Sequence, residues 1–198
     1  MSALQGLVLA GGRSSRMRED KAALTYQRRP QLERAIGLLA PFVSRAWVSV
    51  REDQRDDPLR AGFPQIVDGP DVEGPIAGII AAQAAFPRTA WLVIACDLPM
   101  LESTTLSELI AGRDMSRLAT AFQSASDGLP EPLCAIYEPA SRDPILRFVA
   151  SGVSCPRKFL MRHDVALLAP ASPQALANAN TPEELAAARQ MLASRERA

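Results

Sequence analysis

Two uninterrupted apolar segments, each followed by a polar turn, are the strongest indication of how this chain folds. Residues 6–10 precede two glycines, and residues 90–95 precede a cysteine and Asp97. Apolar segments of this length without alternation are typical of strands that are covered on both faces, as in parallel sheets. The two segments therefore predict the central strands of a parallel sheet.

Shorter strand-like and helix-like segments alternate along the rest of the chain. Alternation through the first half predicts one α/β domain over residues 1–198, with a Rossmann-like, doubly wound, mostly parallel sheet and helices on both faces. Two later strands around a loop predict some mixed or antiparallel pairing. We expect further strands at 46–50, 65–67, 118–123, 133–137 and 165–168, and helices at 31–39, 76–86, 103–110, 145–151 and 182–193.

Composition excludes several classes of protein. The 22 basic residues balance the 22 acidic ones, whereas a nucleic-acid-binding protein normally carries an excess of basic residues on one face. Hydrophobic residues make up 47% of the chain, which is enough for a full core and argues against disorder. We expect a globular protein that does not bind nucleic acid.

The cysteines and the histidine argue against three kinds of site. Cys96, Cys134 and Cys155 are far apart and odd in number, which favours neither a disulfide framework nor a zinc site. The single histidine, His163, makes a histidine metal site or a Ser-His-Asp triad improbable and favours a surface or structural role.

Targeting and membrane signals are absent from the pattern of apolar residues. The first six residues lack a basic stretch followed by a long apolar one, and residues 76–86 are too short to cross a bilayer. We therefore expect a cytosolic protein without membrane contact.

Chemically active residues follow the predicted strands. In open parallel sheets ligands bind at the carboxyl ends of the strands, which would gather the loop 11–21, Asp68 and Asp97 at one edge. Glycines in the loop allow close approach of a phosphate, and its arginines and Lys21 supply positive charge. The alternative is a glycine turn with solvated arginines, and the residues alone leave both open.

Each of the other candidate positions also has a structural alternative. Asp97 could hold Mg²⁺ beside phosphates or cap a turn. Gly78, within a predicted helix, could admit a ligand or pack against another element. Thr181 and Glu184 form a capping-box pattern that explains the start of the last helix but leaves Asn178 and Asn180 unexplained.

Four motifs together resemble one family. Residues 9–21 read Leu-Ala-Gly-Gly-Arg-Ser-Ser-Arg-Met-Arg-Glu-Asp-Lys and resemble the LAGGxSxRMGxDK signature of the molybdenum cofactor guanylyltransferases. Residues 74–78 are similar to their GPLAG segment, residues 96–99 to their CDxP and residues 178–184 to their NxNTPEE. The order and spacing also agree over about residues 7–187. The resemblance implies the fold of the nucleotide-diphospho-sugar transferases.

The resemblance implies a reaction in which GTP and molybdopterin give the guanine dinucleotide cofactor and pyrophosphate. Nucleotide binding would occupy about residues 1–100 and acceptor binding about residues 101–198. Transient contacts with proteins that deliver and receive the cofactor would follow. Catalysis is implied for Arg16, Lys21 and Asp97, with Mg²⁺ on Asp97; nucleotide binding for Leu9, Ala10, Gly11, Gly12, Lys21, Asp68, Gly78 and Asp97; and acceptor binding for Arg157, Asn178 and Asn180.

Three departures from the family pattern bear on specificity. Arg18 stands where glycine is usual and Arg51 where asparagine is usual, while Glu131 begins a segment that often begins with histidine. Two alternatives therefore stay open: a nucleotidyltransferase with another base or acceptor, such as a molybdopterin cytidylyltransferase or a sugar-phosphate nucleotidyltransferase, and a non-catalytic nucleotide-binding delivery protein. Ala10-Gly11-Gly12, where the cytidylyltransferases usually read Ala-Ala-Gly, favours guanine, and the presence of both Lys21 and Asp97 favours an enzyme.

Overall fold

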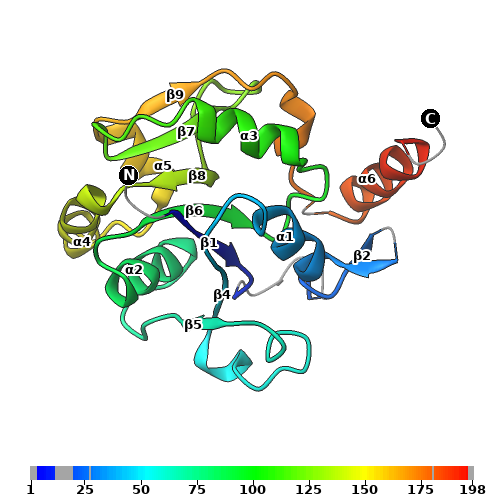
Figure 1. The fold of residues 1–198 in the computed structure, drawn as a ribbon, viewed down its shortest axis with the longest axis horizontal. Helices are drawn as coiled ribbons and strands as arrows, with labels where there is room; N and C mark the ends of the chain where they lie inside the picture. Colours follow the sequence, from blue (N-terminus) through cyan, green and yellow to red (C-terminus); the bar gives the residue numbers. More distant parts are fainter. Residues whose placement is uncertain (1–3, 12–19, 27, 180, 196–198) are drawn as a thin grey trace.

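The computed structural model describes residues 4–11, 20–26, 28–179 and 181–195 (Figure 1). Its central feature is a seven-stranded sheet in the order β5-β4-β1-β6-β8-β7-β9. Four strands from the first half pair in parallel, namely β1 (Leu4–Leu9), β4 (Ala46–Val50), β5 (Gln65–Val67) and β6 (Ala90–Ala95). The two apolar segments that predict the central strands pair directly as β1 and β6.

The second half extends the sheet with mixed directions, as expected. β8 (Pro130–Tyr137) runs antiparallel to both β6 and β7 (Ala119–Gln123), and β9 (Ala166–Leu168) runs parallel to β7. β8 begins three residues before the predicted strand, where two prolines argued for a loop. A register shift between Ala121 and Phe122 accommodates this extension.

Helices cover both faces of the sheet and explain why its strands do not alternate. α1 (Gln31–Leu39) and α3 (Ser103–Ala111) pack on one face, where Val8 and Ile94 point. α2 (Pro75–Ala85), α4 (Arg142–Ala150) and α5 (Pro156–Arg162) pack on the other face, where Leu7 and Val93 point. Successive residues of the central strand β6 are therefore all buried, and the predicted doubly wound α/β fold is confirmed (Figure 1).

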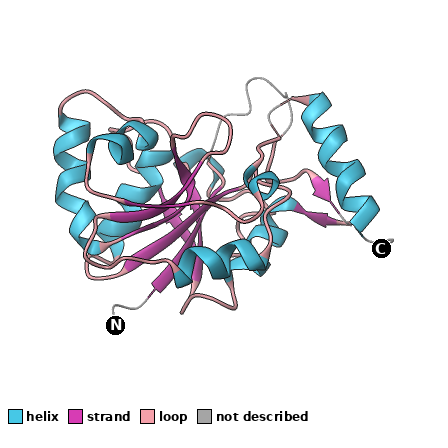
Figure 2. Ribbon diagram, turned by 90° about the horizontal axis from the view of Figure 1, so that it is seen from above, coloured by secondary structure: helices cyan, strands magenta, loops and turns pink. Residues whose placement is uncertain are grey.

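A small third cluster lies beside the sheet. The two-stranded hairpin of β2 (Thr25–Tyr26) and β3 (Arg29–Pro30) was not predicted, and neither was α5. Tyr26 on this hairpin and Leu185 and Leu192 of α6 (Pro182–Arg195) share the cluster, so the last helix lies against the hairpin (Figure 2). The described residues also form the 3₁₀ helices η1 (Glu52–Gln54), η2 (Pro139–Ser141) and η3 (Pro173–Leu176).

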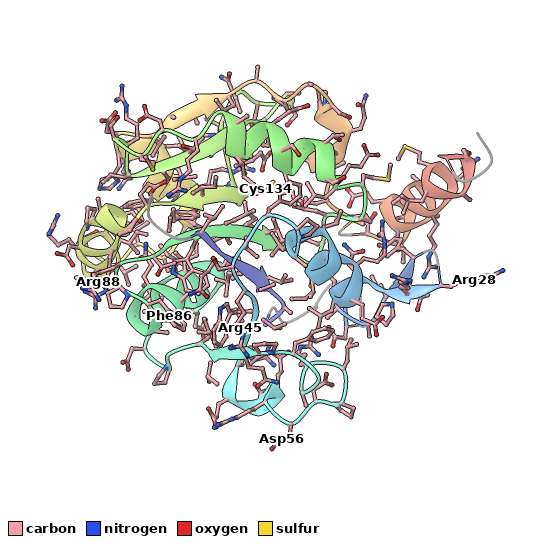
Figure 3. The ribbon with its side chains drawn as sticks, in the orientation of Figure 1. Arg28, Arg45, Asp56, Phe86, Arg88 and Cys134 are labelled. Carbon is pink, nitrogen blue, oxygen red and sulfur yellow. The ribbon has the colours of Figure 1, made fainter. Side chains whose placement is uncertain are left out.

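Two features of the sequence take structural roles. The ring of His163 stacks on Phe159 with ring centroids 4.2 Å apart, and its Nδ1 lies 2.8 Å from the Phe159 carbonyl oxygen. Burial raises the pKa of the Cys134 thiol to about 12, so this cysteine stays protonated within the sheet (Figure 3). Within the described residues, no helix is both long and apolar enough to cross a membrane.

Candidate active site

The carboxyl ends of the four parallel strands meet at one edge of the sheet. Gly11, Arg51, Asp68 and Asp97 follow β1, β4, β5 and β6 within two residues of the strand ends. The topology therefore brings Gly11, Asp68 and Asp97 together as predicted, and Arg51 lies with them. Arg13, Arg16 and Gly12, which were also expected at this edge, lie outside the described residues.

Lys21 and Asp97 form the central contact of this edge. Lys21 Nζ donates a hydrogen bond to Asp97 Oδ2 at 3.1 Å, although 76 positions separate the two residues in the chain. Their side chains are 22% and 19% exposed, so both remain within reach of a ligand. The geometry thus joins the end of the glycine-rich loop to the end of the most buried strand.

Asp97 has the features of a cation ligand. Its second oxygen, Oδ1, is buried and has no hydrogen-bond partner among the described residues. A carboxylate oxygen without a donor fits Mg²⁺, which typically takes one or two carboxylates and completes its shell with waters and substrate phosphates. The described part of the chain has no cluster of three or more His, Cys, Asp or Glu side chains suited to a metal. Among the described residues, Asp97 is therefore a single carboxylate ligand, and waters or substrate phosphates could complete the shell of a cation.

Asp68 lies on the opposite side of the β1 terminus. The Ser49 hydroxyl donates to Asp68 Oδ1 at 2.6 Å, and a Cβ at position 11 would lie 3.1 Å from Asp68 Oδ2. Burial raises the pKa of Asp68 more than Ser49 and Arg51 lower it. A side chain at position 11 would therefore require the Asp68 carboxylate to shift by a few tenths of an ångström.

Arg51 packs across the same terminus. Its guanidinium donates to the Gly11 carbonyl oxygen and to both carboxylate oxygens of Asp53. The arginine at this departure from the family pattern therefore holds the start of the glycine-rich loop.

Gly78 is explained by packing. It lies within α2, and a Cβ there would come within 2.3 Å of Ser49 Oγ and 2.7 Å of a Leu9 methyl carbon. The absence of a side chain makes room for the hydroxyl that holds Asp68. This supports the packing alternative of the sequence analysis, and the expected contact of Gly78 with a base stays a prediction.

The backbone at the end of β1 is already engaged within the protein. The Leu9 carbonyl accepts from the Cys96 amide at 3.3 Å, and the Ala10 amide donates to the Ser49 carbonyl at 3.2 Å. Direct backbone contacts from Leu9 and Ala10 to a nucleotide therefore stay predictions.

A cavity of about 440 Å³ opens beside this edge. Two of the three predicted acceptor residues, Arg157 and Asn178, contribute to its wall, and the third, Asn180, lies outside the described residues. The adjacent Ala179 amide donates to the Asp97 carbonyl at 3.0 Å, which ties this wall to the sheet edge. The lining residues are Glu73, Gly74, Pro75, Leu98, Glu131, Pro132, Leu133, Cys134, Ser154, Cys155, Pro156, Arg157, Leu176 and Asn178.

Arg157 is held by carboxylates in this structure. Its guanidinium donates to Asp127 at 3.1 Å and to Glu131 at 3.0 Å. An anionic acceptor would therefore have to compete with two carboxylates for this arginine. Its neighbour Lys158 does not line the cavity.

A buried residue behind the edge, Arg60, was not predicted from the sequence. Its side chain is 1% exposed and donates to both oxygens of the Asp20 carboxylate, at 2.7 and 2.8 Å. Burial raises the pKa of Asp20, but hydrogen bonds from Arg60 and the Ala22 amide outweigh it, so the net pKa is lowered. Sequence offered no signal for this contact, since Arg60 lies in a polar segment rich in arginine and aspartate.

Comparisons with known proteins agree with this geometry. A family model described as "MobA-like NTP transferase domain" matches residues 6–167. A probable molybdenum cofactor guanylyltransferase from Trichormus variabilis is 33% identical over 94% of this chain and 90% of its own length. The chain belongs to the family of MobA-like NTP transferases. It is therefore a nucleotidyltransferase, and the expected family, fold and enzyme class are confirmed.

One further relative and two solved structures are similar to this MobA-like chain, and the two structures show the same fold. A bifunctional molybdenum cofactor biosynthesis protein from Synechocystis is 36% identical over 91% of this chain, which spans about half (52%) of that relative. A crystal structure of molybdopterin-guanine dinucleotide biosynthesis protein A from Archaeoglobus fulgidus has a TM-score of 0.80 at 24% identity and covers 96% of this chain and 99% of its own. A Mycobacterium tuberculosis protein solved with manganese shares the fold, with a TM-score of 0.68 at 16% identity, covering 96% of this chain and 99% of its own.

Proposed function

We propose that this protein transfers GMP from GTP to molybdopterin, giving the guanine dinucleotide cofactor and pyrophosphate. The observation that carries the proposal is the Lys21–Asp97 pair at the sheet edge, joined through the Ala179 amide to the wall of a separate cavity. This arrangement offers one place for a charged nucleotide and another for an acceptor. The family assignment supplies the reaction class.

Transfer requires one in-line displacement at phosphorus. A phosphate oxygen of the acceptor forms a bond to the α-phosphorus of GTP, and the bond from that phosphorus to the pyrophosphate oxygen breaks. No covalent bond to the protein forms, so catalysis rests on positioning and compensation of charge. We propose that Lys21 and Arg16 compensate the triphosphate and the departing pyrophosphate.

Asp97 would hold Mg²⁺ through its unpaired Oδ1. When bound there, the ion would supply positive charge beside the phosphates. The other oxygen, Oδ2, accepts from Lys21, so the lysine ammonium would contribute its positive charge beside the phosphate oxygens. The metal and these residue roles belong to the proposal.

Nucleotide binding is proposed for Gly11, Gly12, Asp68 and the backbone of Leu9 and Ala10. Gly11 lies at the end of β1 beside Asp68, and the lack of a side chain leaves its backbone uncovered for contact with a phosphate. The division into a nucleotide half, about residues 1–100, and an acceptor half, about 101–198, follows the change from parallel to antiparallel pairing between β6 and β8.

The cavity is proposed to hold the acceptor. Its walls combine apolar side chains with Asn178, Arg157 and Glu131, which suits a flat heterocycle carrying polar groups. Arg157, Asn178 and Asn180 are the proposed contacts. Transient contacts with proteins that deliver and receive the cofactor are part of the proposal, because the product must pass to an enzyme that uses it.

Pyrophosphate release tests the function. Purified protein is incubated with molybdopterin, Mg²⁺ and either GTP, CTP or ATP, and we expect release with GTP alone. Release with CTP alone would replace the proposal by cytidylyl transfer. No release with any nucleotide, with each one still bound, would favour a non-catalytic binding protein.

A further inference from the structure

Arg60 connects two parts of the chain that flank the glycine-rich loop. Its Nη2 donates to the Ala10 carbonyl at 3.0 Å and to Asp20 Oδ1 at 2.8 Å, while its Nη1 donates to Asp20 Oδ2 at 2.7 Å. Ala10 directly precedes residues 11–19 and Asp20 directly follows them. One buried guanidinium therefore fixes the distance between the two residues.

The chain beyond Asp20 is held equally firmly. Asp20 Oδ1 accepts from the Ala22 amide at 3.1 Å, and the Ala22 carbonyl accepts from the amide of Leu32 in α1 at 3.0 Å. Lys21 lies between these two fixed residues. Its backbone position is therefore set by Arg60 on one side and by α1 on the other.

We infer that Arg60 is a positioning residue for Lys21, acting through Asp20. This inference rests on the proposed role of Lys21 in guanylyl transfer. Arg60 does not reach the substrate; it holds the Asp20 carboxylate so that the Lys21 ammonium meets Asp97 at the sheet edge. A lysine at position 60 would keep the charge but could not donate to two carboxylate oxygens and a carbonyl in one plane.

Asp57 provides a matched control for this role. Its carboxylate accepts from Arg60 Nη1 at 3.0 Å and from the Arg60 amide at 3.1 Å, so both of these contacts lie within its own turn. Asp20 and Asp57 are 40% and 35% exposed, so replacing either by asparagine removes a carboxylate charge of similar exposure beside the same guanidinium. Only the Asp20 replacement loosens the connection to Lys21.

Steady-state kinetics of Asp20→Asn, Asp57→Asn and Arg60→Lys test the inference. We expect kcat to fall about tenfold to a hundredfold for Asp20→Asn and Arg60→Lys, as for a displaced catalytic group, with the KM for molybdopterin unchanged. Asp57→Asn should lower the melting temperature by a similar amount to Asp20→Asn, but its kcat should stay within about twofold of that of the unmodified protein. Adding Asp20→Asn to Arg60→Lys should lower kcat little further, because both break the same connection.

A purely stabilising role gives a different pattern. The inference is overturned if kcat falls equally in Asp57→Asn and Asp20→Asn at matched melting temperature. It is also overturned if the separate decreases in kcat of Asp20→Asn and Arg60→Lys multiply in the double variant, because Arg60 would then not act through Asp20.

Hydrogen exchange separates this inference from the proposed function. Without any nucleotide, amide exchange in a peptide covering residues 20–26 should be about tenfold faster in Arg60→Lys and Asp20→Asn than in Asp57→Asn. If the unmodified protein transfers no nucleotide, the proposed function fails, and the exchange rates still decide the positioning role. Equal rates in all three variants would overturn it.

Discussion

Lys21 and Asp97 form an ion pair that contributes little to the stability of the fold, and we propose that both residues act in the reaction. Both side chains are partly exposed, and such pairs contribute about 1 kcal/mol or less. The fold therefore does not depend on the contact, whereas the proposed reaction depends on both groups.

Asp97→Ala is accordingly expected to separate activity from folding. Transfer should fall by more than about 100-fold, because the site loses its proposed cation ligand and a partner of Lys21. The free energy of unfolding in urea should change by about 1 kcal/mol or less. Robust pyrophosphate release by this variant would remove Asp97 from its proposed role.

The ionised form of Asp68 lowers the stability of the folded protein. Its pKa is raised chiefly by burial, so the folded protein binds a proton that the unfolded chain releases near pH 4. Stability therefore falls as pH rises through the interval between the unfolded and folded pKa values, and the loss is complete above it.

Asp68→Asn should remove this loss while keeping an oxygen for the Ser49 hydroxyl. We expect a melting temperature at pH 7 equal to or above that of the unmodified protein, with the difference disappearing below about pH 4. Calorimetry at both pH values makes the measurement. A clearly lower melting temperature at pH 7 would show that the carboxylate stabilises the fold.

At the scale of elements, α2 approaches the sheet more closely than a side chain would allow. Gly78→Ala should destabilise the protein by about 1–3 kcal/mol, because its Cβ would displace Ser49 and Leu9. Gly37→Ala is the matched control: Gly37 is an exposed glycine of α1 with no atom within 4 Å of the place a Cβ would take, and alanine there should stabilise by up to about 1 kcal/mol. Urea denaturation measures both, and equal effects would refute the packing explanation.

Elements formed by local sequence patterns were predicted, whereas elements that depend on contacts with distant parts of the chain were not. β1 and β6 were predictable because burial on both faces leaves a local apolar pattern. The hairpin of β2 and β3 has two residues in each strand and is stabilised by α6, so its own sequence carries little signal. The start of β8 was also not predicted, because Pro130 and Pro132 are typical of a loop.

The site shows the same division. Asp68 and Asp97 were predictable because each follows a strand, and four motifs identified the family. Arg60 was not, because its contacts to Asp20 and Ala10 span 40 and 50 positions of the chain. Nothing near Arg60 distinguishes it from the other arginines of its segment, and only the fold brings it behind the loop.

At the scale of the whole molecule, ligand binding should stabilise the fold selectively. GTP with Mg²⁺ at about 100 times its Kd should add about 2.7 kcal/mol, which for a chain of this size raises the melting temperature by roughly 5–10 °C. CTP and ATP at the same concentration should raise it less. Equal shifts for the three nucleotides would contradict the preference for guanine.

The hydrogen bond from the Ala179 amide to the Asp97 carbonyl also sets an order of assembly. During synthesis, β1, β4, β5, β6 and Asp97 leave the ribosome long before residues 176–179, which complete the adjoining wall. The neighbouring cavity can therefore close only after residue 179 has emerged. A premature stop between these points would leave the cavity without the wall that Leu176 and Asn178 supply.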